Sequence, residues 1–346
     1  MPAERFDVAV VGAGIMGSAT AYALARTGRS VVVLERYELG HKRGSSHGTS
    51  RIFRLSYPET RYVEMAIEAR SLWRDVEQAS GRELLVTTGG IDVGEAGEDI
   101  AAALEACGIG FELLEGSAAH GRFSTVQVLN NETILLQPDA GVVAADAAVA
   151  TFQHGTEGAG GEIRTLTQVL ALEPGEDLVE VVTDHGSVTA SVVVVTAGAW
   201  VADLLAPLGF DVPVQPTRET VAYFEIEGAL PALVEWGDPL MYALPTLHGD
   251  LKVAEHIAGP PADPDSTGGV NEISLETLRE WVASRFVGAA PKEHHSETCL
   301  YTNTPDESFI LQRIGRLVIG SPCSGHGFKF APLIGERLAA LAGEVL

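Results

Sequence analysis

Residues 6–35 of this chain, FDVAVVGAGIMGSATAYALARTGRSVVVLE, decide its fold. The apolar run 6–11 is typical of a buried parallel strand, and Gly12, Gly14 and Gly17 follow it in the pattern G-x-G-x-x-G. In this pattern the first glycine permits a tight turn, the second lets the backbone approach a pyrophosphate, and the third lets the next helix pack closely on the sheet. The N–H groups and the dipole at the start of that helix favour a diphosphate without any basic side chain.

A second apolar strand, residues 31–34, ends in an acid where a dinucleotide site requires one. A carboxylate at Glu35 accepts hydrogen bonds from both ribose hydroxyls and repels a 2′-phosphate. A glycine-rich turn in an ordinary βαβ unit would explain the glycines alone, but not the strand, helix, second strand and acid in this order. The stretch therefore predicts a dinucleotide site that favours FAD or NAD over NADP.

The composition is that of an acidic globular protein. The 346 residues include 23 basic and 47 acidic side chains, and the formal net charge of −24 repels nucleic acid and anionic membranes. No apolar run reaches about 18 residues and no basic leader precedes the first strand, so we expect no membrane span and no secretory signal. Cys107, Cys299 and Cys323 are odd in number and lack metal-type spacing, so we expect no disulfides, no metal and a cytoplasmic location.

A basic loop follows Glu35 in this acidic chain. Segment 41–54, HKRGSSHGTSRIFR, contains six lysine, arginine or histidine residues. It is either a solvated surface loop or an active-site loop that presents cations to an anionic group. A second loop, Thr196-Ala197-Gly198, follows the apolar run 192–195 and predicts either a tight turn or a second backbone contact with the dinucleotide.

The pattern of apolar residues in the rest of the chain predicts several helices and two antiparallel sheets. Apolar residues recur at helical spacing in segments 62–78, 144–152, 199–208 and 275–286. Alternating patterns predict a small antiparallel ribbon at 162–170, 178–183 and 187–195, and a second antiparallel sheet at 214–226, 242–246 and 251–255. Segment 108–137 predicts strands and loops only. Short strands, a glycine-rich loop and a helix from about residue 332 indicate that the C-terminal part closes the nucleotide domain.

Three separated segments carry a resemblance to a known family. They are 44–51 (GSSHGTSR), 299–307 (CLYTNTPDE) and 324–329 (SGHGFK), and they resemble the monomeric sarcosine oxidases, whose relatives include N-methyltryptophan and pipecolate oxidases. The resemblance extends over nearly the whole chain. The cysteine and glycine-histidine segments are specific to this family, whereas the dinucleotide fingerprint is not.

The resemblance implies an α/β fold with two domains. A Rossmann-type FAD-binding domain, similar to those of glutathione reductase and p-hydroxybenzoate hydroxylase, would carry an inserted antiparallel-sheet substrate domain. We predict that residues 1–82, 140–213 and 296–346 form the discontinuous FAD-binding domain, and that residues 83–139 and 214–295 form the substrate domain.

The resemblance also implies that FAD is tethered through its 8α-methyl group as a thioether of Cys299. Without the motif, the simplest interpretation of Cys299 would be a half-buried cysteine in a strand. We do not assign the flavin linkage to Cys323. The predicted cofactor-binding residues are Gly12, Gly14, Gly17, Glu35, Arg43, Ser46, Thr196, Gly198, Cys299, Gly325, Gly327 and Lys329.

The matched motifs place substrate and catalytic residues as well. Arg54 and Lys329 would bind the substrate carboxylate, and Tyr242 and His256 would line the substrate pocket, His256 being counted with the catalytic residues. Lys252 matches a lysine that lies over the flavin and activates oxygen, although a surface lysine at the start of a strand is the alternative. His47 and Arg51 match residues on the flavin face that tune its potential. His326 is interpreted as a hydrogen-bonding loop residue.

The predicted activity is oxidation of a small secondary amino acid, either N-methylated like sarcosine or cyclic like proline or pipecolate. The products would be an imine and, from O2, hydrogen peroxide. A flavin dehydrogenase with another electron acceptor is the first alternative, and a non-catalytic dinucleotide-binding protein is the second. We expect a monomer whose partners are the amine and O2, with no nucleic acid or membrane. The amine depends on which side chains of residues 220–260 face inward.

Overall fold

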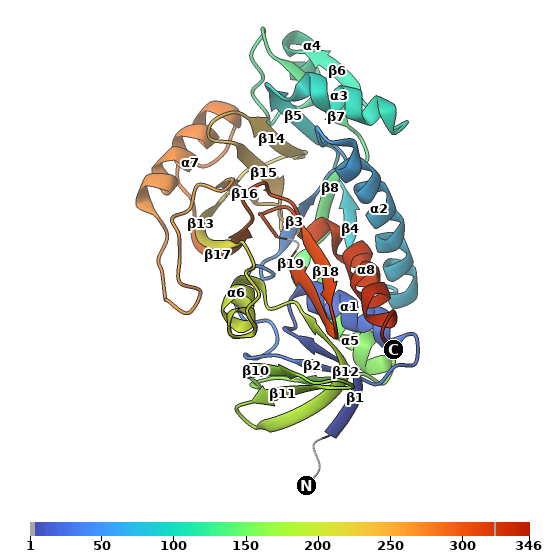
Figure 1. The fold of residues 1–346 in the computed structure, drawn as a ribbon. Helices are drawn as coiled ribbons and strands as arrows, with labels where there is room; N and C mark the ends of the chain where they lie inside the picture. Colours follow the sequence, from blue (N-terminus) through green and yellow to red (C-terminus); the bar gives the residue numbers. More distant parts are fainter. Residues whose placement is uncertain (1–3, 322) are drawn as a thin grey trace.

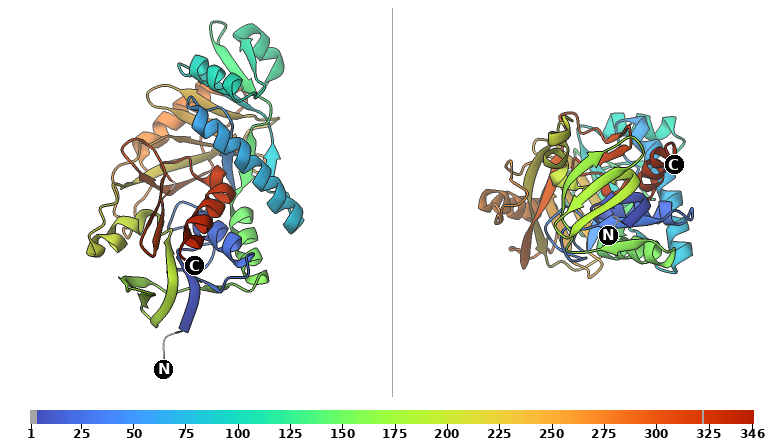
Figure 2. Two further views of the ribbon diagram at one scale, coloured as in Figure 1. Left: turned by 45° about the vertical axis from the view of Figure 1, so that its right-hand side comes forward. Right: turned by 60° about the horizontal axis from the view of Figure 1, so that its bottom comes forward.

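The chain folds around three sheets, as a computed structural model that describes residues 4–321 and 323–346 shows (Figure 1). Two of these sheets have eight strands each and the third has three. The first sheet lies at the end of the molecule that carries the N-terminus. Helices α3 (Gly97–Ala106) and α4 (Gly116–Arg122) lie at the opposite end (Figure 2).

The first sheet contains the predicted nucleotide-binding unit. Its strand order is β10-β11-β12-β1-β2-β9, with β19 beside β12 and β18 beside β19. The strands are β1 (Glu4–Val11), β2 (Val31–Leu34), β9 (Glu162–Arg164), β10 (Val169–Pro174), β11 (Val179–Thr183), β12 (Gly186–Val195), β18 (Ile310–Ile314) and β19 (Leu317–Ser321). β1 lies parallel between β12 and β2, where Val8 is opposite both Val192 and Val31. All three valines are fully buried, as the continuous apolar sequence predicts.

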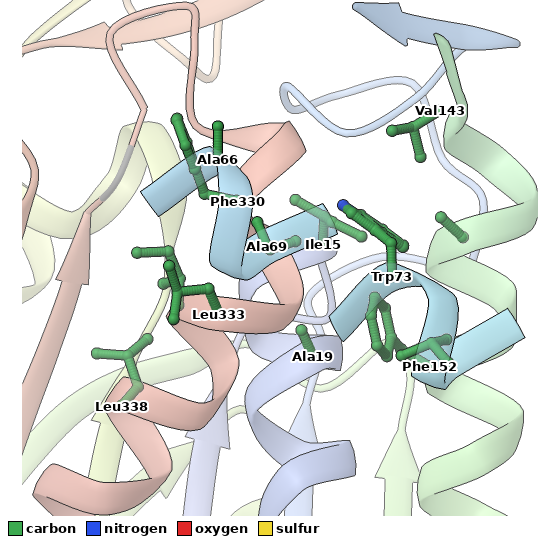
Figure 3. Packing of buried hydrophobic residues seen from close by; sticks show 14 of the residues in the cluster. Ile15, Ala19, Ala66, Ala69, Trp73, Val143, Phe152, Phe330, Leu333 and Leu338 are labelled. Carbon is green, nitrogen blue, oxygen red and sulfur yellow. The ribbon is translucent and has the colours of Figure 1, made fainter. Parts of the chain in front are cut away.

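Four helices pack together over one face of this sheet. They are α1 (Ile15–Ala25), α2 (Thr60–Ser80), α5 (Ala145–Gly158) and α8 (Ala331–Gly343). Trp73 of α2 packs against Phe152 of α5 with their ring centroids 5.6 Å apart (Figure 3). A Cβ atom on Gly335 of α8 would lie 2.7 Å from the backbone of Ala19 in α1, so these two helices approach closely only because a glycine is present. The opposite face is covered in part by the short helix α6 (Val201–Leu205).

The second sheet has the order β17-β13-β16-β15-β14-β5-β7-β6. Its strands are β5 (Gly90–Gly94), β6 (Glu112–Glu115), β7 (Thr133–Gln137), β13 (Gln215–Phe224), β14 (Ala232–Trp236), β15 (Met241–Pro245), β16 (Leu251–Glu255) and β17 (His295–Asn303). Helix α7 (Glu272–Arg285) packs its apolar face on this sheet. β16 and β17 pair antiparallel with opposite edges of β13, so Lys252 and Cys299 lie on the two strands that flank β13.

A small third sheet joins the basic loop to the rest of the molecule. It has the order β3-β8-β4 and comprises β3 (Ser50–Phe53), β4 (Leu85–Thr87) and β8 (Gly141–Ala144). Arg51 lies in β3 opposite Val143 of β8. Part of the predicted loop is therefore a strand, and its arginine is held at a defined place.

Several local predictions differ from the structure. Segment 162–170, predicted as one strand of a ribbon, is two strands, because Leu166 adopts a positive φ of 51° between them and β9 pairs with β2 instead. Segment 108–137 contains the helix α4, which the sequence did not predict. The predicted domain boundary at residue 296 falls inside β17, which belongs to the second sheet. The division into two domains itself stays a prediction.

The described part of the chain lacks two further features. None of its helices combines the length and the apolar character that crossing a bilayer requires. Within residues 4–321 and 323–346, no group of three or more His, Cys, Asp or Glu side chains is arranged to hold a metal ion.

Candidate active site

A cavity of about 1140 Å³ runs between the first and second sheets. Small-molecule sites usually occupy about 300–1,000 Å³, so this one has room for an elongated cofactor together with a small substrate. Most predicted site residues line it: Gly12, Gly14, Glu35, Ser46, His47, Arg51, Arg54, Thr196, Gly198, Tyr242, Lys252, His256, Cys299, Gly325, Gly327 and Lys329. Gly17 and Arg43 are not among its lining residues. The Arg43 guanidinium lies instead 5.7 Å from the centroid of the Tyr37 ring.

The glycines at one end of the cavity make a turn that only glycine permits. Gly12 has a φ of +95°, and a Cβ atom there would lie 2.8 Å from the carbonyl oxygen of Thr196. A Cβ atom on Gly17 would lie 1.9 Å from the carbonyl oxygen of Gly12. The Thr196 hydroxyl donates a hydrogen bond of 2.9 Å to the carbonyl of Val11, so the two predicted loops are directly joined. The turn is therefore packed against both β1 and β12.

The start of helix α1 is suited to an anion. Its N-cap residue, Gly14, makes no side-chain capping bond, and its first turn carries no acid. The amide of Ile15 donates to the Ser46 hydroxyl at 3.0 Å, which leaves the hydroxyl proton of Ser46 for another acceptor. A diphosphate fits here, because the helix dipole and backbone N–H groups face the cavity and the first helical turn carries no acid of its own.

Glu35 is buried beside this turn, with only 5% of its surface exposed. Its carboxylate accepts hydrogen bonds from the amides of Ala13 at 2.7 Å and Tyr37 at 2.9 Å. Burial raises the pKa of Glu35, but the hydrogen bonds from His41 and from these amides outweigh it, so the net pKa is lowered. The carboxylate stays ionised and keeps lone pairs for further hydrogen bonds; its predicted role with the ribose hydroxyls stays a prediction.

A further cluster at this end was missed by the sequence interpretation. Asp265 accepts hydrogen bonds from Arg36 at 2.6 Å and from the indole N–H of Trp200 at 2.8 Å, and all three residues line the cavity. Asp265 lies in the long loop between β16 and α7, which descends beside α6 (Figure 1). The loop is rich in proline, glycine and aspartate, which marks it as a turn but does not reveal its partner.

Cys299 lies in the middle of the cavity wall, 8% exposed. Its Sγ atom is 3.8 Å from the carbonyl oxygen of Ser45, in the basic loop. Burial raises the pKa of the thiol, although Arg51 and Lys252 favour the thiolate. The basic loop and the cysteine motif, far apart in the sequence, thus meet at one point.

Lys252 is buried in the same region, which excludes a surface lysine. Its Nζ atom donates to the carbonyl of Ser50 at 3.2 Å. Burial, reinforced by the charge of Arg51, lowers its pKa to about 7. Arg51 itself donates to the carbonyls of Ser45 at 2.9 Å and His47 at 2.6 Å, so it shapes the loop while its charge faces the cavity.

His47 is an unsatisfied polar group in this wall. Both of its ring nitrogens are buried and find no hydrogen-bond partner among the described residues. Burial and the charge of Arg51 lower its pKa to about 4, so the ring is neutral at neutral pH. A buried neutral imidazole without a partner is suited to a polar ligand.

Two cations lie at the other end of the cavity. Arg54 stacks on Tyr57, 4.1 Å from the ring centroid, and on Trp236 at 5.0 Å. The Lys329 ammonium donates to the Tyr57 hydroxyl and to the carbonyl of His326, both at 2.8 Å. An ammonium has three N–H donors, so one remains for a ligand. Burial, followed by the charge of Arg54, lowers the pKa of Lys329 well below its ordinary value, a shift that a bound anion opposes.

Tyr242 and His256 line the cavity near these cations. The Tyr242 hydroxyl is 3.2 Å from that of Tyr301, and burial raises the pKa of Tyr242 to about 12. Gly325 has a φ of +72°, and a Cβ atom there would lie 2.2 Å from the Tyr301 ring and 2.7 Å from the His256 ring. The glycine-histidine segment therefore packs directly on these side chains. Its own histidine bonds instead to a loop carbonyl.

The fold and the cavity define an FAD-dependent oxidoreductase, and comparisons with known proteins agree. Residues 7–341 match the family described as FAD dependent oxidoreductase, and the chain belongs to this family. Monomeric sarcosine oxidase of Bacillus sp. (strain NS-129) is 34% identical, with 98% of this chain and 93% of that protein covered. Peroxisomal sarcosine oxidase of Homo sapiens is 35% identical, with 98% and 92% covered.

A solved structure is similar over the same extent. NikD, described as an unusual amino acid oxidase essential for nikkomycin biosynthesis, has a TM-score of 0.90 and 26% identity, and the match covers 99% of this chain and 94% of NikD. These findings confirm the predicted family, the α/β fold with a Rossmann-type FAD domain, FAD as the cofactor and the enzyme class of FAD-dependent amine oxidases.

Proposed function

We propose that this chain oxidises a small secondary amino acid to its imine and reduces O2 to hydrogen peroxide. The amine loses two electrons and two protons, and dioxygen gains both pairs. Bound FAD supplies the redox chemistry by accepting the electron pair from the carbon next to nitrogen and passing it on. The observation that carries the proposal is one continuous cavity with a dinucleotide cradle at one end and, at the other, the buried Lys329 and the partly buried Arg54.

The two cations are suited to a single carboxylate. Arg54 is held between aromatic rings and Lys329 by two hydrogen bonds, so both reach the cavity in fixed positions. A planar guanidinium binds a carboxylate bidentately and an ammonium adds a point charge. Tyr242 and His256 would then enclose the amine beside them. We assign substrate binding to Arg54, Lys329 and Tyr242, with His256 next to the reacting carbon.

Covalent attachment of FAD through Cys299 is part of the proposal. It is supported by the family resemblance and by the position of Cys299 in the cavity wall beside Ser45. Cys107, Cys299 and Cys323 form no disulfide with one another, which is consistent with the proposed cytoplasmic location. The purified protein would be precipitated with acid and redissolved in denaturant. A yellow pellet is the expected result, and a colourless pellet below a yellow supernatant would remove this role from Cys299.

Lys252 is proposed to assist the reaction with oxygen. A cation held in a buried wall stabilises the negative charge that develops on dioxygen, with no reorganisation of solvent. His47 and Arg51 lie on the same wall, and we assign to them the tuning of the site. The remaining predicted cofactor residues, Arg43 included, stay predictions.

Two measurements separate this function from its alternatives. One hydrogen peroxide per substrate oxidised is expected for the oxidase, whereas a dehydrogenase would leave most electrons for an added dye. Anaerobic bleaching of the flavin by sarcosine, proline or pipecolate is expected for either enzyme. No bleaching by any secondary amino acid would favour the non-catalytic binding protein. The proposed monomeric state is tested by light scattering.

A further inference from the structure

Glu297 is a carboxylate that the proposed function leaves without a role. It lies in β17 two residues before Cys299, so both side chains are on the same face of the strand, and both line the cavity. Its Oε1 atom accepts a hydrogen bond of 2.6 Å from the Tyr223 hydroxyl. Its Oε2 atom lies 3.7 Å from Nζ of Lys42 and 3.9 Å from Nδ1 of His47.

Three charged groups meet around Gly48. A Cβ atom on this glycine would lie 3.2 Å from Nη1 of Arg51, 3.6 Å from Nζ of Lys252 and 3.7 Å from Oε1 of Glu297. Gly48 has a φ of +110°, so its backbone favours glycine, and the ends of the three charged side chains lie within ordinary or slightly tight contact of this position. The carboxylate therefore lies close to the buried Lys252 and the partly buried Arg51, which come from other strands.

Glu297 is the carboxylate of this cluster that favours the ionised form. The groups facing Lys252 are Arg51 from β3, His47 from the basic loop, Tyr223 from β13, Asp146 from α5, and Glu297 and Cys299 from β17. Lys42 lies beside Glu297. Asp146 accepts a hydrogen bond from the amide of Gly48, and burial raises its pKa. Burial also raises the pKa of Glu297, but the Tyr223 hydrogen bond and the nearby cations outweigh it and the net pKa is lowered.

We propose that the Glu297 carboxylate is the counter-ion that keeps Lys252 protonated in the cavity wall, and that it thereby sets the pH range of the reaction with oxygen. Glu297 is a positioning residue, because it acts through Lys252 and not on the substrate. The inference rests on the proposed function for the oxygen step. The effect of the Glu297 charge on the protonation of Lys252 can be measured without any catalytic turnover.

The titration of Lys252 is accessible because the chain has only four lysines: Lys42, Lys252, Lys292 and Lys329. Holoenzyme labelled with 13C at the lysine ε-carbon would give four NMR signals, and Lys252→Met identifies the signal of interest. In the unchanged protein this signal is expected to titrate near pH 7. An opposite charge within about 4–6 Å shifts a pKa by roughly 1–3 units, so Glu297→Gln should move the titration at least ~1 unit lower.

The rate of reoxidation by oxygen should follow the same titration. Lys252 is protonated below its pKa, so the rate falls as the pH rises through that value. In Glu297→Gln the fall should occur at lower pH, with a loss of about 5-fold at pH 7 that approaches ~10-fold at higher pH for a one-unit shift. Flavin reduction by the substrate should be unchanged. Glu297→Asp should restore the original profile in part.

Tyr223→Phe is the matched control, because it removes the hydrogen bond and keeps the charge. It should leave the Lys252 titration in place, and an equal shift in both variants would assign the effect to structure instead of charge. An unmoved Lys252 signal in Glu297→Gln would overturn the inference. A moved signal in a protein that no amine bleaches would support the counter-ion and reject the proposed function.

Discussion

The two ends of the cavity are built in different ways. The end around Gly12, Gly17 and Glu35 is made of backbone groups packed against one another, and the helix start there carries no acid in its first turn, which suits a diphosphate. The other end is made of two long cationic side chains, Lys329, which is buried, and Arg54, which is partly buried. The structure of the glycine-rich end therefore depends on positions that carry no side-chain atoms, whereas ligand binding at the other end depends on charge. Substitutions that add volume or remove charge should affect the two ends differently.

The largest effect is expected at the backbone-built end. Gly17→Ala places a methyl group 1.9 Å from the carbonyl oxygen of Gly12. This oxygen belongs to the backbone, so it cannot move aside as a flexible side chain could. Overpacking costs about 1–3 kcal/mol and more where backbone must shift, so we expect a lower Tm and less than ~10% of the normal FAD content. Gly158→Ala is the control, because a Cβ atom there meets nothing within 4 Å. Normal FAD content in Gly17→Ala would contradict this comparison.

The next effect is expected from the charge of Lys252. Lys252→Met keeps the volume and removes the cation, so flavin reduction should stay nearly intact while reoxidation slows at least ~10²-fold, the scale of a lost oxyanion donor. Stopped-flow absorbance separates the two half-reactions. Reoxidation at the unchanged rate would reject the assigned role.

A smaller effect is expected at the carboxylate site. A hydrogen bond to a charged group contributes about 1.5–3 kcal/mol, so Lys329→Met should weaken a carboxylate inhibitor such as methoxyacetate by ~10-fold or more. The neutral methoxyacetamide should bind equally to both proteins. Lys292→Met, an exposed lysine, is the control. Equal loss of the acid and the amide would indicate a distorted pocket instead of a lost charge.

The smallest effect is expected at Asp265, where the long loop contacts the backbone-built end. Asp265→Asn weakens two hydrogen bonds of about 1 kcal/mol each, so FAD should dissociate several-fold faster. The measurement uses the Cys299→Ser background, in which the proposed tether is absent, and follows flavin fluorescence on dilution. Asp211→Asn, at an exposed position, should not change the rate. An unchanged rate in Asp265→Asn would mean that the loop does not retain the cofactor.

Prediction from sequence succeeded where the signal is local. Strand β1, the glycine turn, helix α1 and strand β2 form a contiguous unit, and its residues have the conformations that the motif requires. The sequence also identified segments 44–51, 299–307 and 324–329 as parts of the site, although the roles predicted for their residues came from the family resemblance. Prediction failed at Leu166, where a positive φ divides a predicted strand, because alternation does not report on a strand's partner.

The sequence alone determined the class of fold, the type of cofactor and the family, because spacing of glycines and short motifs are local properties of a chain. The tertiary structure decided which distant residues meet: Asp265 with Arg36 and Trp200, and Glu297 with Lys252 across different strands. Such contacts depend on strand register and loop path, and the burial they produce shifts the pKa values. A charge acquires a function here only through the groups packed around it.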